Sequence, residues 1–369
     1  MSNPRHLILV GAGHAHLHLI SRLHEHLAAG LRVTVIAPSP FWYSGLGPAM
    51  LGGDAELDDD TVDVRALVER AGATFLEDIV TRILPETHRV QIRNHPKLAY
   101  DALSLNVGSQ IAGPPGSEEF ATPVKPISHL LDLRHRITAR PRTHIPLRIV
   151  VVGAGDAGVE VTGNLRRLLN HLGQPFHITL VSPENQPLAS YPPRAAKLFR
   201  ASLKDENIRF LMAYRVTEIR ADTVLLDDNT SLDTDLTVLA TGVHPPELLQ
   251  VSGLPVADDG ALRVNPFLQN CQYLRIFGAG DCIHFEAKPL PRVGVHSVRQ
   301  APVLHHNLQA FLCDRPLRAY RPQSAYLLIR NLGDGTGLLT WRGLVMRSRW
   351  ALQFKTWLDT RFVRQYQKH

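Results

Sequence analysis

An apolar, strand-like run that ends in a glycine turn occurs twice in this chain of 369 residues. The first run, Leu7–Val10, leads into Gly11-Ala-Gly13, and the second, Arg148–Val152, leads into Gly153-Ala-Gly155-Asp-Ala-Gly158. In such a turn the first glycine permits the bend, the second lets the backbone approach a pyrophosphate, and the third lets helix and strand pack closely. The two copies lie too far apart to serve one nucleotide, so the chain predicts two dinucleotide sites.

Each turn is followed by a helix-length segment and a second β-rich run, which is how a βαβ unit begins. In the first copy His16 stands where the third glycine would be, so we expect a local shift between helix and strand there. Neither second strand ends in the acid that binds ribose hydroxyls; Ser39 and either Ser182 or Glu184 are the candidate substitutes. Without that acid, the choice between NADH and NADPH stays open.

Three further strand ends carry nucleotide-binding features. Tyr100–Gly108 repeats the first pattern in degenerate form, Asp235–Gly242 ends in Ala-Thr-Gly, and Leu274–Asp281 ends in Gly-Ala-Gly-Asp. Along the chain the order is therefore the first glycine turn, the strand that ends at Gly108, the second glycine turn, the strand that ends at Gly242, and the Gly280-Asp281 pair.

This order resembles the two-dinucleotide-domain flavoproteins of the pyridine nucleotide-disulfide oxidoreductase superfamily. The resemblance implies an α/β fold with two Rossmann-like dinucleotide-binding domains in the three-layer, glutathione-reductase-like arrangement. It places the NAD(P) domain inside the FAD domain and leaves a short basic region at the C-terminus. The expected parts are a first FAD-binding part at 1–110, a crossover segment at 111–146, an NAD(P)H-binding domain at 147–246, a second FAD-binding part at 247–325, and a C-terminal region with a basic aromatic tail at 326–369.

The resemblance also implies FAD and NAD(P)H as cofactors and assigns residues to them. The first turn meets the FAD pyrophosphate, the Asp281 carboxylate bonds the ribityl or phosphate region, and the second turn meets the NAD(P)H pyrophosphate. The turn at Thr241 and Gly242 is the usual crossover between domains. The expected cofactor-binding residues are Gly11, Gly13, His14, Ser39, Gly108, Gly153, Gly155, Gly158, Ser182, Thr241, Gly242, Gly280 and Asp281.

Four short segments resemble one group within the superfamily, the type II NADH dehydrogenases. They look most like the flavoprotein module found fused to selenide, water dikinase. The segments are Gly11–His16, Tyr43–Pro48, Pro123–Pro126 and Val298–Gln300.

The cysteines exclude one electron path of the superfamily. Cys271, Cys282 and Cys313 include no pair at the four-residue spacing of a flavin-adjacent dithiol. Three cysteines are an odd number and few for a chain of this length, which also argues against the disulfide framework of a secreted protein. We therefore expect hydride to pass from NAD(P)H to flavin and electrons to pass directly to a small acceptor.

Four residues are candidates for that chemistry. Glu160 matches the acid that helps to place the nicotinamide in type II NADH dehydrogenases, although a carboxylate near a helix N-terminus is also stabilised by the dipole. Gln300 matches the last glutamine of their quinone-side helix, and His296 departs from the first position of that motif. His296 could donate a proton to the acceptor or be structural. Lys125 could stabilise the reduced flavin or be a solvated linker residue.

The three histidines of the first turn suggest a metal site, because residues i and i+4 share a helical face. Their place in a phosphate-binding turn argues against it, and we predict no metal. The histidines are His14, His16 and His18.

The net charge of +6 is concentrated in the tail, since residues 341–369 hold seven basic side chains and one acid. Three of the four tryptophans also lie there, a composition typical of membrane interfaces. On a helical wheel Arg361, Arg364 and Lys368 return to the aromatic arc, so we expect a short apolar segment followed by a basic end. The alternative is a helix docked on its own domain or on a partner.

The sequence thus predicts an FAD-dependent NAD(P)H oxidoreductase that reduces a quinone or another small acceptor. We expect a cytoplasmic protein with peripheral membrane contact through residues 341–369, because no signal or spanning segment is present. Nucleic acid binding is not expected, and a homodimer is left open. Two other functions remain: a reductase of an electron-carrier protein, and a flavoprotein module acting in redox sensing or selenium metabolism.

Overall fold

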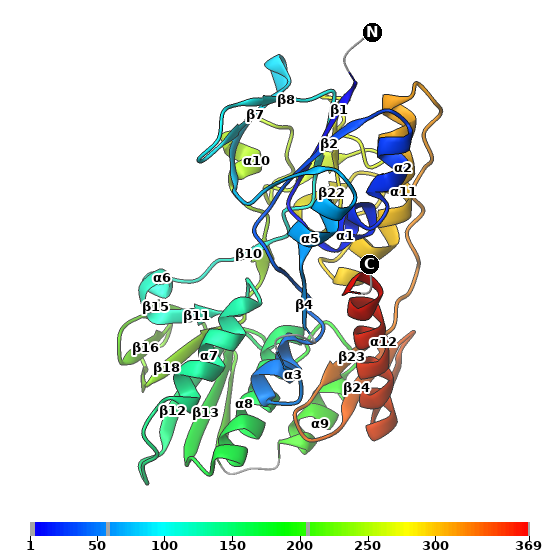
Figure 1. Ribbon diagram of the computed structural model, residues 1–369. Coiled ribbons are helices and arrows are strands. Elements are labelled where there is room, and N and C mark those ends of the chain that lie inside the picture. Colours follow the sequence, from blue (N-terminus) through cyan, green and yellow to red (C-terminus); the bar gives the residue numbers. More distant parts are fainter. Residues whose placement is uncertain (1–3, 57–59, 204–206, 368–369) are drawn as a thin grey trace.

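The first of two parallel five-stranded sheets forms the upper half of the molecule in Figure 1. The computed structural model describes residues 4–56, 60–203 and 207–367. Every residue of the strand that leads into the first glycine turn is buried, as expected for a parallel strand covered on both faces. The sheet has the order β21-β9-β1-β2-β5, with β1 at His6–Val10, β2 at Arg32–Ile36, β5 at Thr74–Leu76, β9 at Ala102–Leu105 and β21 at Ile276–Gly278.

The second parallel sheet forms the lower half and repeats the arrangement of the first. In both sheets the strand before the glycine turn lies between the next strand of its βαβ unit and a strand that arrives later in the chain. One edge strand of the second sheet, β11, comes from the segment that was expected to serve as a crossover. The order is β11-β18-β12-β13-β14, with β11 at Ala121–Pro123, β12 at Leu147–Val152, β13 at Phe176–Ser182, β14 at Ile208–Met212 and β18 at Leu236–Leu239.

A three-stranded antiparallel sheet is inserted at the same place in each half, just before β9 and just before β18. Together with helices on the parallel sheets, these give the predicted α/β fold of two Rossmann-like domains. The first small sheet is β6 (Val80–Leu84), β7 (Arg89–Ile92) and β8 (Leu98–Ala99), and the second is β15 (Val216–Ile219), β16 (Thr223–Leu226) and β17 (Ser231–Asp233).

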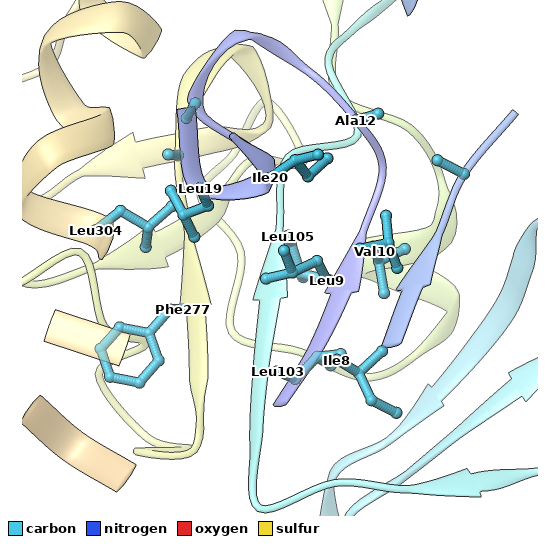
Figure 2. Close-up of a cluster of buried hydrophobic side chains, with 14 of the residues drawn as sticks. Ile8, Leu9, Val10, Ala12, Leu19, Ile20, Leu103, Leu105, Phe277 and Leu304 are labelled. Atoms are coloured by element: carbon cyan, nitrogen blue, oxygen red, sulfur yellow. The ribbon is translucent and has the colours of Figure 1, made fainter. Parts of the chain in front are cut away.

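Helices α1 and α11 pack on the first sheet and enclose its core. Figure 2 shows Leu19 of α1 beside Leu304 of α11, with Phe277 of β21 and Leu9 and Leu105 of neighbouring strands below them. Because α11 follows the second domain in the chain, the first domain is built from two separate parts. The helices of this half are α1 (His14–Ile20), α2 (Leu23–Ala28), α5 (Val64–Arg70) and α11 (Gly294–Leu312).

Helix α3 (Gly47–Gly52) belongs to the first part of the chain but packs against α7 and α8 of the second half. A Cβ on Gly47 would lie 2.8 Å from the Ile127 side chain, and one on Gly52 would lie 2.6 Å from the Asn164 amide oxygen. These two glycines therefore allow the halves to approach closely. The helices of the second half are α7 (Ser128–Thr138), α8 (Asp156–Leu172) and α9 (Pro193–Ser202).

The C-terminal region is a three-stranded antiparallel sheet followed by one helix, α12, which runs unbroken over Arg349–Gln367. The basic residues Arg361 and Arg364, which the sequence places on the aromatic arc, lie within this helix. A second face of α12 is buried in the protein, so the helix does not depend on a continuous apolar stripe. Lys368 lies outside the described residues. The strands are β23 (Leu328–Asn331), β24 (Gly337–Trp341) and β25 (Leu344–Ser348).

Two chain segments cross between the halves and pair with each other as the antiparallel ladder of β10 and β19. No helix among the described residues is long and apolar enough to span a bilayer. The remaining elements are short: β3 (Phe41–Trp42), β4 (Thr61–Val62), β10 (Gln110–Ile111), α6 (Ser117–Phe120), β19 (Val243–His244), α10 (Leu248–Val251), β20 (Leu262–Val264), β22 (Ile283–Phe285), and the 3-10 turns η1 (Pro85–Thr87) and η2 (Gly280–Cys282).

Candidate functional site

The first glycine turn is pressed against the end of β9. Gly11 has φ of +81°, and a Cβ there would lie 2.5 Å from the carbonyl oxygen of Asn106. A Cβ on Gly13 would meet the Asn106 side chain at the same distance. The turn therefore requires both glycines before any nucleotide is considered, and its cradle fits the backbone approach that a pyrophosphate needs.

Asn106, at the end of β9, ties the N-terminus of α1 to the segment that follows β21, a role that the sequence did not reveal. Its side-chain oxygen accepts hydrogen bonds from the backbone N–H groups of Ala15 and His16, and its amide donates to the carbonyl of Ala279 at 2.6 Å. Ser297 of α11 accepts a second bond from Ala15 N–H at 3.1 Å. The N-terminus of α1 is thus held largely by the protein itself.

His16 fills the place of the missing third glycine. Its ring is fully buried, with Nδ1 2.6 Å from the Gly11 carbonyl and Nε2 2.8 Å from the Ser104 hydroxyl. Burial lowers the pKa of His16 to about 4, and that of His14 also to about 4. His14 packs against the rings of Phe41, Tyr43 and Phe362. Both histidines are therefore neutral at physiological pH.

The second predicted FAD motif meets the first turn at the end of β21. Gly280 N–H donates to the Gln300 side-chain oxygen at 2.7 Å. Asp281 accepts from the Ser109 hydroxyl at 2.8 Å and from the Lys125 ammonium at 2.9 Å. Burial alone would raise the pKa of Asp281, but Lys125 and Ser109 together hold it below its usual value. Lys125 is thus not a free linker residue, because it is half-buried and paired with Asp281.

His296 lies beside this motif in the first turn of α11. It lines a small cavity with Gly280, Asp281 and Gln300, and its ring packs edge-on against Tyr326 at 5.4 Å. Burial lowers the pKa of His296, and its Nε2 atom has no hydrogen-bond partner among the described residues. The cavity is therefore lined by an imidazole whose Nε2 atom is buried and unpaired among the described residues.

The second glycine turn is pressed against β18 in the same manner as the first against β9. Gly153 has φ of +105°, and a Cβ there would collide with the Ala240 carbonyl. A Cβ on Gly158 would collide with the Gly153 carbonyl, so the third glycine is required by packing. Gly155 stands open at the start of α8, because a Cβ there would have no heavy atom within 4 Å.

The other predicted cofactor positions lie near the ends of strands. Ser182 ends β13, is buried, and accepts a hydrogen bond from the Glu184 N–H at 3.3 Å. Thr241 donates to the Ala112 carbonyl at 2.7 Å. Nothing lies within 4 Å of a Cβ on Gly108 or Gly242, and Ser39 is half-buried beyond the end of β2.

A buried polar cluster joins α12 to both halves of the molecule. Lys355 donates to the Gly45 carbonyl and to Asp359, each at 2.6 Å, and Tyr43 donates to Asp359 at 2.9 Å. Burial would lower the pKa of Lys355, but Asp359 and Glu160 more than offset this and raise it. These tail residues are therefore structural partners of the site, which the sequence did not suggest.

Glu160 belongs to the same cluster. It accepts a hydrogen bond from the Asn331 backbone N–H at 2.7 Å. Burial raises its pKa to about 7, against the opposing effects of Lys355 and that N–H group. Glu160 can therefore exchange a proton near neutral pH.

The cysteines are all free and are not assembled as a relay. Cys282 is completely buried, its thiol lies 3.3 Å from the Ala279 carbonyl, and burial raises its pKa to about 12. The described residues also contain no group of three or more histidines, cysteines or acids that could hold a metal ion.

Comparison with known proteins identifies the class that this fold and these two turns define. A model of the family "Pyridine nucleotide-disulphide oxidoreductase" matches residues 5–303. The chain belongs to this family, whose members bind FAD and NAD(P)H, and it is an FAD-dependent NAD(P)H oxidoreductase.

Several relatives cover most of the chain at low identity. A probable NADH dehydrogenase of Dictyostelium discoideum is 24% identical, over 95% of this chain and 86% of that protein. Ferroptosis suppressor protein 1 of Taeniopygia guttata is 27% identical over 72% of this chain and 71% of its own. Demethylphylloquinone reductase NdbB of a Synechocystis strain is 25% identical over 79% and 76%.

Two solved structures show how widely the fold is shared. NDH2 from Plasmodium falciparum, in complex with NADH, has a TM-score of 0.79 at 16% identity, over 99% of both chains. The sulfide:quinone oxidoreductase of Aquifex aeolicus has a TM-score of 0.80 at 19% identity, over 99% of this chain and 92% of that one. The narrower resemblance to the module fused to selenide, water dikinase stays a prediction.

Proposed function

We propose that this oxidoreductase transfers the reducing equivalents of NAD(P)H to a quinone at a membrane surface. One NAD(P)H, one proton and one quinone give NAD(P)⁺ and one hydroquinone. The relatives described as an NADH dehydrogenase and a demethylphylloquinone reductase support the donor and the acceptor class. The observation that carries the proposal is the two-faced helix α12.

One face of α12 is part of the site, and the opposite face is apolar and exposed. Lys355 and Asp359 point into the protein, where they meet Tyr43. Trp350 is 80% exposed and Trp357 is 53% exposed. Exposed aromatics followed by basic residues suit the boundary between lipid tails and headgroups. The exposed aromatic face is Trp350, Phe354, Trp357 and Leu358, and Trp341, Leu344 and Met346 of the preceding hairpin are exposed as well.

The chain's own residues would divide the work as follows. Gly11, Gly13 and Asp281 would hold FAD, which would supply the hydride-accepting and two-electron-donating chemistry between NAD(P)H and the acceptor. Glu160, with a pKa near 7, would hold and release a proton on the NAD(P)H side, beside the Lys355 ammonium. His296, with its unpaired Nε2, would offer a hydrogen bond to the acceptor beside Gly280. Lys125 would act through Asp281, by fixing the carboxylate in its ionised form.

Electron transfer to the acceptor would involve no thiol. Cys282 carries the thiol nearest the predicted FAD motif, and a thiol with a pKa of about 12 holds no useful thiolate at neutral pH. Electrons would therefore pass directly to the acceptor.

Anaerobic stopped-flow tests the electron path. The purified flavoprotein is mixed with NADH or NADPH, flavin bleaching is followed, and a ubiquinone or menaquinone analogue is then added. Fast bleaching and fast reoxidation are expected. Bleaching without reoxidation by quinone would contradict the proposal and favour a carrier protein as acceptor. Slow bleaching by both nucleotides would favour a sensor.

Liposome sedimentation tests the membrane contact. The double variant Phe354→Ser/Trp357→Ser is expected to lose binding to anionic liposomes while it keeps its FAD. The control variant Ile145→Ser/Leu274→Ser removes two exposed apolar side chains elsewhere and should bind as the wild type does. Equal binding by all three proteins would contradict a membrane role for α12.

A second acceptor class is favoured by the basic residues that follow the aromatic face, including Arg361 and Arg364. An acidic carrier protein could dock there. Salt would slow such a reaction, whereas reduction of a soluble quinone analogue would be nearly independent of salt. The salt dependence of reoxidation therefore separates the two.

A further inference from the structure

Arg330 of β23 is a buried cation at the second glycine turn that the function described above does not use. It is 1% exposed. Its Nε donates to the Asp156 carboxylate, its Nη1 donates to the Thr340 hydroxyl at 3.2 Å, and its Cζ lies 4.0 Å from the centre of the Tyr191 ring. Nη2 is buried and has no hydrogen-bond partner among the described residues.

Asp156 explains why a cation is needed here. It is the first residue of α8 and directly follows Gly155, the open glycine of the turn. A dinucleotide pyrophosphate at this helix N-terminus would meet the carboxylate as a like charge. The Asp156 carboxylate accepts hydrogen bonds from Arg330 and from the Tyr191 hydroxyl, the latter at 2.8 Å.

We propose that Arg330, supplied by the C-terminal sheet, is a binding residue for the pyrophosphate of NAD(P)H at the second glycine turn. The inference rests on NAD(P)H binding at this turn and not on the identity of the acceptor. Arg330 cancels the charge of Asp156 through Nε and donates to a phosphate oxygen through Nη2.

The chemistry of the two groups matches. A guanidinium is a fixed planar fork of donors that suits phosphate oxygens, and its hydrogen bonds to an anion are charge-assisted. An unpaired buried donor is unfavourable, and a phosphate oxygen would satisfy it. The helix N-terminus of α8 adds backbone N–H groups at the same place.

Tyr191 covers this donor. Its ring lies over the guanidinium, yet the side chain is only half-buried and follows β13 in an irregular segment. We infer that the pyrophosphate displaces the Tyr191 side chain from Arg330 and Asp156, so that Arg330 alone then compensates the carboxylate. The C-terminal sheet thereby contributes to both the nucleotide turn and, through Asn331, the Glu160 environment.

Equilibrium binding of NAD⁺, ADP-ribose and AMP, measured by calorimetry, tests the inference without any turnover. Arg330→Met is expected to weaken NAD⁺ and ADP-ribose at least tenfold and AMP less than twofold, because only the first two carry a pyrophosphate. Loss for NAD⁺ alone would place the contact at the nicotinamide and overturn the proposal. An equal loss of affinity for NAD⁺, ADP-ribose and AMP would also overturn the proposal.

A double variant separates the phosphate contact from charge compensation. Arg330→Met/Asp156→Ser should remain at least fivefold weaker for ADP-ribose than Asp156→Ser alone. Equal affinities would mean that Arg330 only neutralises Asp156, which overturns the phosphate contact. Tyr191→Ala should bind ADP-ribose at least as tightly as the wild type, and a tenfold loss there would assign the contact to the tyrosine instead.

A matched control tests whether the effect is structural. Arg347→Met removes a second arginine–aspartate pair of the same sheet, Arg347 with Asp334, away from the turn. It should bind ADP-ribose within twofold of the wild type. FAD content and the thermal midpoint are measured for each variant, and a loss with Arg347→Met equal to that with Arg330→Met would overturn the proposal.

Discussion

The two glycine turns share a backbone solution but differ in what surrounds them. Each begins with a left-handed glycine pressed against the end of a neighbouring parallel strand, at Asn106 in one case and Ala240 in the other. At the first, the groups that bond the turn itself are the neutral His16 and Asn106, and the nearby charges of Lys125 and Asp281 are paired with each other. The second stands open at Gly155 and carries charges.

This difference fits the two cofactors of the family. A turn closed by internal hydrogen bonds across β1, β9 and α11 is a rigid seat for a cofactor that stays bound. In the second glycine turn the Arg330 donor is covered by one half-buried side chain, Tyr191. Such a site suits a substrate that binds and leaves in every catalytic cycle. We therefore expect substitutions in the first turn to lower both the stability and the FAD content of the protein. Substitutions in the second turn should change its affinity for NAD(P)H.

The largest expected effect is at Asn106. In Asn106→Ala, the His16 N–H loses its buried partner, the Ala15 N–H keeps only Ser297, and the Ala279 carbonyl keeps only the weak Cys282 thiol donor; an unsatisfied buried group costs about 1–3 kcal/mol. We expect the free energy of unfolding to fall by about 3–5 kcal/mol and the purified protein to lose most of its FAD. Denaturant unfolding and the flavin-to-protein absorbance ratio measure this.

Asn307→Ala is the matched control. Asn307 is also fully buried and makes three hydrogen bonds, to Phe267 and Arg318, away from the turn. Its folded fraction should keep FAD at the wild-type ratio despite a similar loss of stability. FAD loss of the same size in both variants would mean that Asn106 acts only through global stability.

The glycines of the second turn come next. Gly153→Ala adds a Cβ that collides with the Ala240 carbonyl at a φ of +105°, so we expect a loss of stability of about 2–4 kcal/mol.

Gly155→Ala is unstrained, since φ is −77° and no heavy atom lies within 4 Å of the added Cβ. Any loss of NAD(P)H affinity in Gly155→Ala therefore reports contact with the ligand. Thermal unfolding should distinguish the variants, and wild-type NAD⁺ affinity in Gly155→Ala would show that the pyrophosphate lies elsewhere.

These turns were predictable from the sequence because glycine at fixed spacing is a local requirement. The Lys355–Asp359 pair was not. Both residues looked like solvated tail charges, and their partners Gly45 and Tyr43 are more than 300 residues away in the chain. Arg330 was missed for the same reason, since its partner Asp156 is 174 residues distant. Asn106 lay in a recognised strand end, but its side-chain bonds depend on how three strands meet.

A smaller effect is expected from the pH dependence of Glu160. The folded chain holds this proton up to about pH 7, whereas the unfolded chain releases it near 4.5. Stability is therefore lost as pH rises through that interval, by up to about 3 kcal/mol at 1.36 kcal/mol per pKa unit. Glu160→Gln should lack this contribution, so the difference in unfolding free energy between the variant and the wild type should change between pH 5 and pH 8. A constant difference would show that Glu160 titrates normally.

The smallest expected effect is at Cys282, and it tests whether any thiol connects the two turns. The thiol lies directly after Asp281 but donates only to main-chain carbonyls, and its pKa of about 12 keeps it protonated. Cys282→Ala removes one sulfur from a buried site, so we expect a loss of stability of about 1 kcal/mol. Rates of flavin reduction and reoxidation should stay within twofold of the wild type. A large loss of reoxidation alone, with full FAD content, would show that electrons leave through sulfur after all, because nothing else at this position could respond to the change.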